Sequence, residues 1–341
     1  MDNKVTKARL SAFIQYEWIK LVSLLIVAVL LVTLTFMGIG SESRLLNNGQ
    51  TFYLHYYNTN PDATVDGTKM ENVKKLLGNG VFSYEVQEIA VSTSDTSTHP
   101  YWMEAGNVDM VIATHTTGNP DDDDDLSIAK TDFNYLVDNF AVHDYVTYYQ
   151  KARAYAKTFL PTGVEVLDGD LGSISDDAIL DKTLIDDAKV KTSFLSRSFK
   201  DNRFKTEEEK LQAIGLEKAR IEALFQNVND LQKLLVERPE IFISYKKYTA
   251  SYHNASESEK QAYEADYLLE TEKLYGIDLS KLTCNVSGKA SITDYATLLG
   301  ATTAKGMVLA IFDVERHQPT LHYESLSALT AIVKATTDFL D

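Results

Sequence analysis

The hydrophobic pattern begins with one apolar run of membrane length and continues with short alternating segments. Leu21–Ile39 carries no charge and, at about 1.5 Å per residue, is long enough to cross a bilayer as a helix. Thr51–Tyr57 is rich in aromatic residues, as strands are, and Thr68–Leu77 has the spacing of an amphipathic helix. Phe82–Gln87 alternates like a half-buried strand, and Asp109–Thr114 is a short apolar run typical of a buried strand. This order predicts an α/β layer with a right-handed crossover.

Helical spacing dominates the middle of the chain. Thr131–Leu160 places apolar residues at intervals of three and four, and Thr206–Glu237 begins with a capping box and is followed by Pro239. The narrow apolar seam of this long helix is interrupted by Glu217 and predicts an antiparallel helical partner. We expect that partner to be Ile241–Tyr252 or Ser258–Tyr275.

The chain then returns to extended structure. Gly306–Phe312 reads as a strand and Ser325–Leu340 as an amphipathic helix. If this strand pairs beside Asp109–Thr114, both ends of the chain build one lobe. The expected fold class is therefore α/β with a large helical insertion. The expected organisation is a cytoplasmic segment (1–18), a transmembrane helix (19–40), the first part of an α/β lobe (41–130), a mainly helical lobe (131–282) and a return to the α/β lobe (283–341).

The apolar run near the N-terminus favours a retained single-pass anchor. A cleaved signal peptide is the alternative, but its apolar region is usually about 7 to 15 residues and ends at a small-residue cleavage site, which Phe36–Gly40 lacks. Basic residues lie mainly before the run, at Lys4, Lys7, Arg9 and Lys20. This distribution predicts a cytoplasmic N-terminus and a C-terminal part outside the cell.

Charge and cysteine content limit the partners. The formal net charge of −16 makes nucleic acid an unsuitable partner, because neutralising phosphates requires a basic face. Cys284 is the single cysteine, so no intrachain disulfide can form. An exported chain without disulfides fits a bacterial surface better than a eukaryotic secretory route.

Two phrases carry a partial resemblance to a known family. The aromatic stretch Phe52–Asn60 ends in an Asn-containing turn, and Glu104–Ile112 reads EAGNVDMVI. Both resemble the first and third strands of the type 2 extracellular solute-binding proteins, the periplasmic-binding-protein fold. The phrase Glu104–Ile112 is one residue shorter than the corresponding phrase of the family and lacks its proline. The lipoprotein cysteine is also missing. The resemblance implies a membrane-anchored relative whose second lobe has become helical.

Loop positions after two strands are the candidate ligand site. In open α/β sheets, ligands lie beyond the carboxyl ends of strands. Tyr57, Asn58 and Asn60 follow the first strand, and His115 and Thr116 follow the third. These side chains either fix a polar ligand in a cleft between lobes or serve ordinary turn chemistry.

Catalytic and metal motifs give little support to an enzyme. The sequence contains no H-E-x-x-H, no G-x-S-x-G and no glycine-rich phosphate loop. Calcium is the one metal that the sequence leaves as a candidate, because carboxylate oxygens of the kind it binds are clustered in two places. Its candidate ligands are Asp121, Asp122 and Asp123 in the run of five aspartates, and Asp168 and Asp170 around a glycine. The alternative to a calcium site is that the acidic run is a solvated connecting loop.

The sequence therefore predicts a non-enzymatic, single-pass cell-envelope protein without a cofactor. Its expected partners are the membrane, through Leu21–Ile39, and a small polar ligand or a protein bound at a cleft between lobes. The alternative is a structural or assembly component of the envelope with a degenerate cleft. An envelope hydrolase that uses two carboxylates is the third hypothesis.

Overall fold

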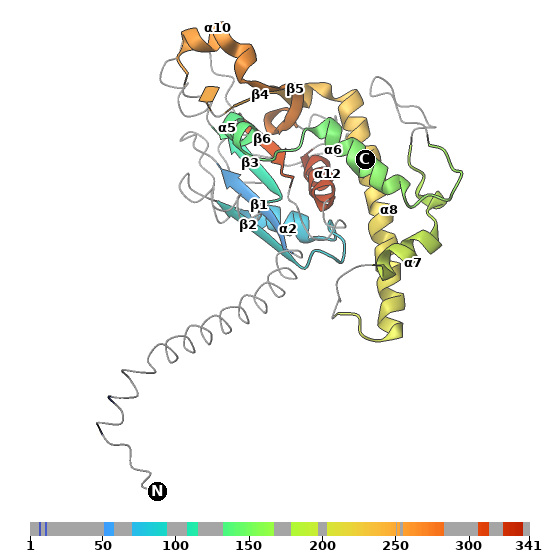
Figure 1. Ribbon diagram of the computed structural model, residues 1–341. Helices are drawn as coiled ribbons and strands as arrows, with labels where there is room; N and C mark the ends of the chain where they lie inside the picture. Colours follow the sequence, from blue (N-terminus) through green and yellow to red (C-terminus); the bar gives the residue numbers. More distant parts are fainter. Residues whose placement is uncertain are drawn as a thin grey trace. The chain divides into compact units, whose positions relative to one another are not determined.

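The computed structural model describes most of the chain beyond residue 50 (Figure 1). Apart from Lys7 and Ser11, the described residues are 51–57, 70–93, 108–114, 132–166, 179–196, 203–249, 251–252, 255–282, 306–313 and 323–336. Residues 1–49 and 50–341 form separate compact units. The expected transmembrane segment lies outside the described residues, and among those residues no helix is long and apolar enough to span a membrane.

A mixed six-stranded sheet forms the centre of the larger unit. Its strand order is β2-β1-β3-β6-β5-β4. The strands are β1 (Thr51–Tyr57), β2 (Glu88–Thr93), β3 (Met110–Thr114), β4 (Phe242–Tyr248), β5 (Leu268–Asp278) and β6 (Met307–Ile311). β1 runs parallel to β2 and β3, whereas β6 is antiparallel to β3 and to β5. The expected pairing of the late strand beside β3 is confirmed, so both chain ends contribute to one sheet.

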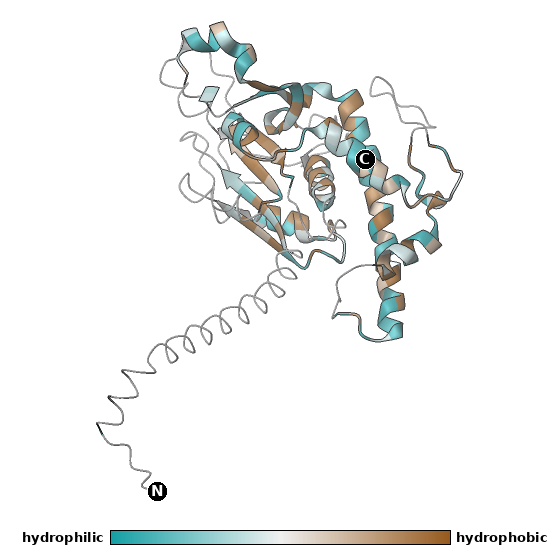
Figure 2. Ribbon diagram, in the orientation of Figure 1, coloured by the Kyte–Doolittle hydropathy of each residue, from teal (hydrophilic) through white to brown (hydrophobic). Residues whose placement is uncertain are grey.

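Helices cover the sheet unequally. The α-helices are α2 (Met70–Gly78), α5 (Asp132–Asn139), α6 (Tyr145–Lys157), α7 (Asp187–Leu195), α8 (Glu207–Glu237), α10 (Glu257–Tyr267) and α12 (Glu324–Thr336). One core cluster joins one face of the sheet to α2, α6, α8 and α12, and a smaller cluster joins the other face to α5. In Figure 2 the apolar colouring is clear on the central strand β3 and occurs in patches along α8 and α12, whereas α10 is mostly hydrophilic.

The described part of residues 131–282 corrects the expectation of a separate helical lobe. β4 and β5 come from this range and extend the common sheet, and α6 and α8 share a core with β1 and β3. Ile241–Tyr252 was expected to be helical, but Phe242–Tyr248 is a strand. Ser258–Tyr275 is divided between α10 and β5. In both ranges the apolar residues fit periods of two and of 3.6, so the pattern alone does not separate strand from helix.

Other predicted boundaries also change. Phe82–Gln87 is a turn rather than a strand, and β2 begins only at Glu88. Thr131–Leu160 is broken into α5 and α6, with the carboxylate of Asp144 capping α6 by accepting a hydrogen bond from the Thr147 N–H. The long helix α8 has the predicted capping box, formed by Thr206 and Glu209. It packs mainly against α6, α12 and α7, and not against a helix formed by residues 241–252.

Candidate functional site

The carboxyl ends of β1 and β3 meet at one edge of the sheet. The two strands are parallel, and Tyr57 is aligned with Ala113. In the strand order, β1 is followed in the chain by β2 on one side, whereas β3 is followed by β4 on the other side, so the strand order reverses between β1 and β3. Such a point, where strand order reverses, is where open α/β sheets bind ligands. The structure thus brings together the two strand ends from which the predicted ligand residues follow.

The predicted ligand residues are only partly within the described part of the chain. Tyr57 is buried and belongs to the core cluster on the α5 face of the sheet. Asn58, Asn60, His115 and Thr116 lie outside the described residues, so their role stays a prediction.

His55 is a polar residue near this edge that the sequence analysis did not select for ligand binding. It lies two positions before Tyr57 on the same face of β1, and its ring is buried. Its Nδ1 atom is 3.0 Å from Oγ of Ser92 on the neighbouring strand β2. In the sequence, His55 is a single histidine within an aromatic strand, and this is a weak indication of a polar contact. Its partner Ser92 can be identified only from the pairing of β1 with β2.

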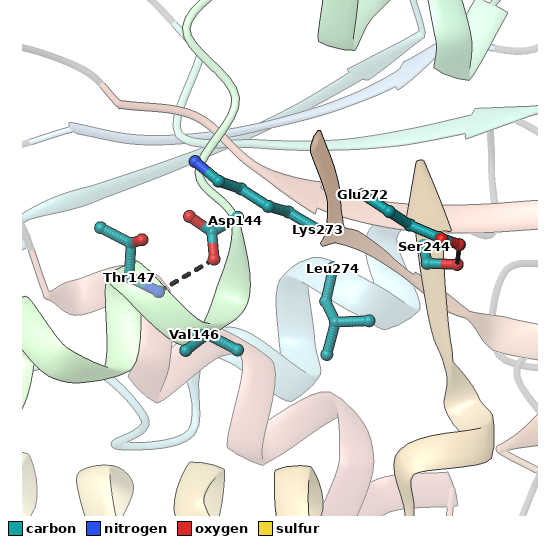
Figure 3. A pocket seen from close by; sticks show the side chains of 7 residues that line it. All are labelled: Asp144, Val146, Thr147, Ser244, Glu272, Lys273 and Leu274. Atoms are coloured by element: carbon teal, nitrogen blue, oxygen red, sulfur yellow. Dashed lines mark hydrogen bonds between the residues drawn. The ribbon is translucent and has the colours of Figure 1, made fainter. Parts of the chain in front are cut away.

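A groove lies at the opposite ends of these strands, between the start of α6 and the strands β4 and β5 (Figure 3). Val142, in the connection between α5 and α6, bridges to Phe312 just beyond β6, on the side where β3 begins. The groove next to this connection has a volume of about 470 Å³. It is lined by Asp144, Val146, Thr147, Ser244, Glu272, Lys273 and Leu274. Its size is within the usual range for small-molecule sites.

The polar groups of the groove largely satisfy one another. The Ser244 hydroxyl donates to the Glu272 carboxylate at 2.6 Å, across the β4–β5 pair (Figure 3). Lys273 is bonded to Glu270, and this hydrogen bond raises the pKa of the lysine. Val146 and Leu274 form a partly buried apolar floor. The groove therefore combines an apolar floor with polar side chains that are hydrogen-bonded to one another or to neighbouring residues.

A buried charge cluster joins the turn after α2 to α8 and α12. We define it as Glu85, Arg203, Glu217, Arg220 and Glu324. The Arg220 guanidinium donates from Nε and Nη2 to the two carboxylate oxygens of Glu217, each at 2.9 Å, in a nearly solvent-free position. Burial is the largest influence on Arg220 and opposes its charge, but the hydrogen bonds to Glu217 together with the charges of Tyr155, Glu217 and Glu324 hold its pKa above the ordinary value. Glu217, the polar interruption of the predicted seam, is thus half of a buried ion pair.

No group of three or more metal-binding side chains occurs within the described residues. The five aspartates proposed for calcium lie outside those residues, so the calcium hypothesis stays a prediction from the sequence.

No protein-family description, curated protein or solved structure matches the chain significantly.

Proposed function

We propose that the protein is a non-enzymatic, membrane-anchored binding protein that takes a small polar ligand at the carboxyl ends of β1 and β3. In this proposal Leu21–Ile39 spans the membrane, and the α/β unit lies outside the cell. The two phrases that resemble type 2 solute-binding proteins include β1 and the start of β3, so the resemblance concerns the same strands.

The parallel alignment of Tyr57 with Ala113 carries the proposal. It brings the carboxyl ends of β1 and β3, from which the two loops continue, together at the reversal point of the sheet. Asn58, Asn60, His115 and Thr116 then supply amide, imidazole and hydroxyl groups for a polar ligand. The non-enzymatic character is supported by the sequence, which lacks the common catalytic motifs.

Ligand binding should raise the thermal midpoint of the full chain in detergent. At a concentration one hundred times Kd, a ligand stabilises by about 2.7 kcal/mol, which corresponds to about 5–10 °C for a unit of this size. The experiment screens sugars, amino acids and short peptides by thermal shift. Asn58→Ala and His115→Ala should each abolish the rise in thermal midpoint that the binding compound produces in the wild type.

Asn79→Ala is the matched control, because Asn79 is exposed in the turn after α2, at the opposite edge of the sheet. This variant should keep the full shift. A screen in which no compound changes the midpoint, or a shift equally reduced in all three variants, would remove the support for this site.

The groove at the other edge favours the second hypothesis, an assembly component of the envelope. Its open form and its apolar floor suit contact with another protein as well as with a small molecule. A photo-crosslinker at Leu274 in intact membranes distinguishes the hypotheses. Specific crosslinks to one envelope protein would favour assembly, whereas the absence of any crosslink would leave ligand binding as the better explanation.

A further inference from the structure

Strand β5 is paired along only one of its edges for most of its length. On one side, β4 follows it from Ile277 to Leu268. On the other side, within the described residues, the ladder with β6 covers only Ile277 and Asp278. We propose that the open edge of β5, beside the groove, accepts an extended basic peptide segment of a partner protein as an additional strand. This proposal deepens the assembly hypothesis, on which it rests, and is independent of the ligand site at β1 and β3.

A β-bulge lies where β5 leaves β6. Ile243 is aligned with Gly276 and Ser244 with Leu274, so Tyr275 is an extra residue on β5. A bulge bends its strand, and the pairing with β6 includes no residue on the N-terminal side of this bulge. The end of β6 is hydrogen-bonded instead to the connection between α5 and α6.

The open edge of β5 presents backbone groups that an added strand can use. Successive residues of a strand direct their N–H and C=O groups to opposite edges, so about every second residue from 269 to 274 points them away from β4. In the part of the chain that the structure describes, these six residues make backbone hydrogen bonds only with β4. Main-chain hydrogen bonds to such an edge are the usual basis of strand addition.

The groove borders this edge of β5. Leu274 packs against the core on the α6 face, and Glu272 shares that face, whereas Lys273 belongs to the other face of the strand. All three line the groove, so the groove reaches around the edge of the strand instead of covering one face. Its other wall is the start of α6, and in Figure 3 the Lys273 side chain extends towards Asp144.

The charged side chains at the groove favour a basic partner. Asp144 and Glu272 are its carboxylates, and Lys273, the cation in its lining, is bonded to the carboxylate of Glu270. Lys247 lies opposite Glu270 on β4, outside the lining of the groove. The lining therefore has an excess of negative charge, as does the whole chain with its net charge of −16. Lysine or arginine side chains of a partner would complement it.

The apolar floor and the condition of the outer strand complete the description of the partner. Val146 and Leu274 form a partly buried surface that can receive an apolar side chain. The outer edge of β4 suits a basic strand less well, because β4 carries two adjacent lysines. The Tyr248 N–H of β4 also donates to the Asp138 carboxylate at 2.7 Å. The partner segment is therefore an extended peptide in which basic and apolar residues alternate.

The test measures binding of a fluorescein-labelled heptapeptide of alternating lysine and valine to the full chain in detergent, by fluorescence anisotropy. A glutamate–valine heptapeptide should bind at least about tenfold more weakly, because its charges face carboxylates. Two further lysine–valine peptides carry N-methyl groups, one on its valines and the other on its lysines. Alternate N–H groups point to opposite edges, so one of these peptides should lose more than about tenfold in affinity while the other keeps it.

Glu272→Lys should weaken binding of the lysine–valine peptide by about three- to tenfold. Glu208→Lys is the matched control, since it makes the same charge change at an exposed position near the start of α8 and should leave the affinity unchanged. Bound peptide should slow hydrogen exchange of the β5 amides but not of β2, the edge strand at the far end of the sheet. No measurable affinity, equal losses with both N-methylated peptides, or protection of β2 instead of β5 would overturn the proposal.

The photo-crosslinker at Leu274 separates this proposal from the assembly hypothesis. Crosslinks to one envelope protein without any binding of the lysine–valine peptide would refute strand addition and leave the assembly contact standing. Crosslinks confined to a second copy of this chain would refute a foreign partner. Crosslinks to an envelope protein that the lysine–valine peptide displaces, and that the glutamate–valine peptide does not, are the expected result.

Discussion

Replacing Arg220 with methionine is expected to destabilise the protein by about 3–5 kcal/mol, because the carboxylate of Glu217 would be left buried without its cation. Both side chains are at most 5 % exposed. The Tyr155 hydroxyl would also lose the guanidinium that donates to it at 2.9 Å. The loss is measured by denaturant unfolding of the full chain in detergent, at constant pH.

The double variant Glu217→Gln with Arg220→Met is the control for this prediction. It removes both charges together, so much of the lost stability should return. Arg220→Lys keeps a charge but not the bidentate geometry, and should lie between the wild type and Arg220→Met. A loss below about 1 kcal/mol for Arg220→Met would show that water or another group reaches Glu217 easily.

Gly276→Ala is expected to have the second large effect, a destabilisation of at least about 1–3 kcal/mol through overpacking. Gly276 lies on β5, against β6 and α5. A Cβ atom at this position would overlap the Cγ1 atom of Val308 and lie 2.8 Å from the Cε2 atom of Phe133. Because both neighbours are fully buried, neither side chain has space to move away.

Gly215→Ala is the matched control on α8, where a Cβ atom would meet nothing within 4 Å. There, the higher helix propensity of alanine should stabilise the protein by about 0.5–1 kcal/mol. Combining Gly276→Ala with Val308→Ala should cost less than the sum of the two single changes, since the smaller neighbour makes room for the new methyl group. Purely additive costs, or similar effects at both glycines, would contradict the overpacking explanation.

Gly276 shows why sequence position alone misleads. In the sequence it directly follows the predicted helix over Ser258–Tyr275, and a glycine at such a position commonly ends a helix. In the structure it lies in strand β5, where a Cβ atom would collide with the side chains of Val308 and Phe133. The two roles require the same residue type for different reasons, and only the neighbours distinguish them.

The strands next to the candidate site were predictable from the sequence, but their contacts were not. The pattern of β1 and β3 predicted two strands of one α/β layer, and the alignment of Tyr57 with Ala113 shows that their carboxyl ends meet. The contact between His55 and Ser92 depends on the register of β1 with β2, which begins six residues later than the alternating pattern suggested. The groove depends on the packing of the start of α6 beside β4 and β5, which has no local sequence signal.

The sequence by itself determined the α/β class, the strands β1, β3 and β6, and the capped helix α8, because strong periodicity and caps act over a few neighbouring residues. Only the tertiary structure decided that β4 and β5 extend the sheet and that the described helices and strands share one compact unit. Segments whose residues fit both a strand and a helix adopt whichever form buries their apolar side in the assembled core. In the sequence, Glu217 only interrupts the apolar seam of a helix. In the structure it is the buried ion-pair partner of Arg220, because packing between segments that are distant in sequence excludes water from both side chains.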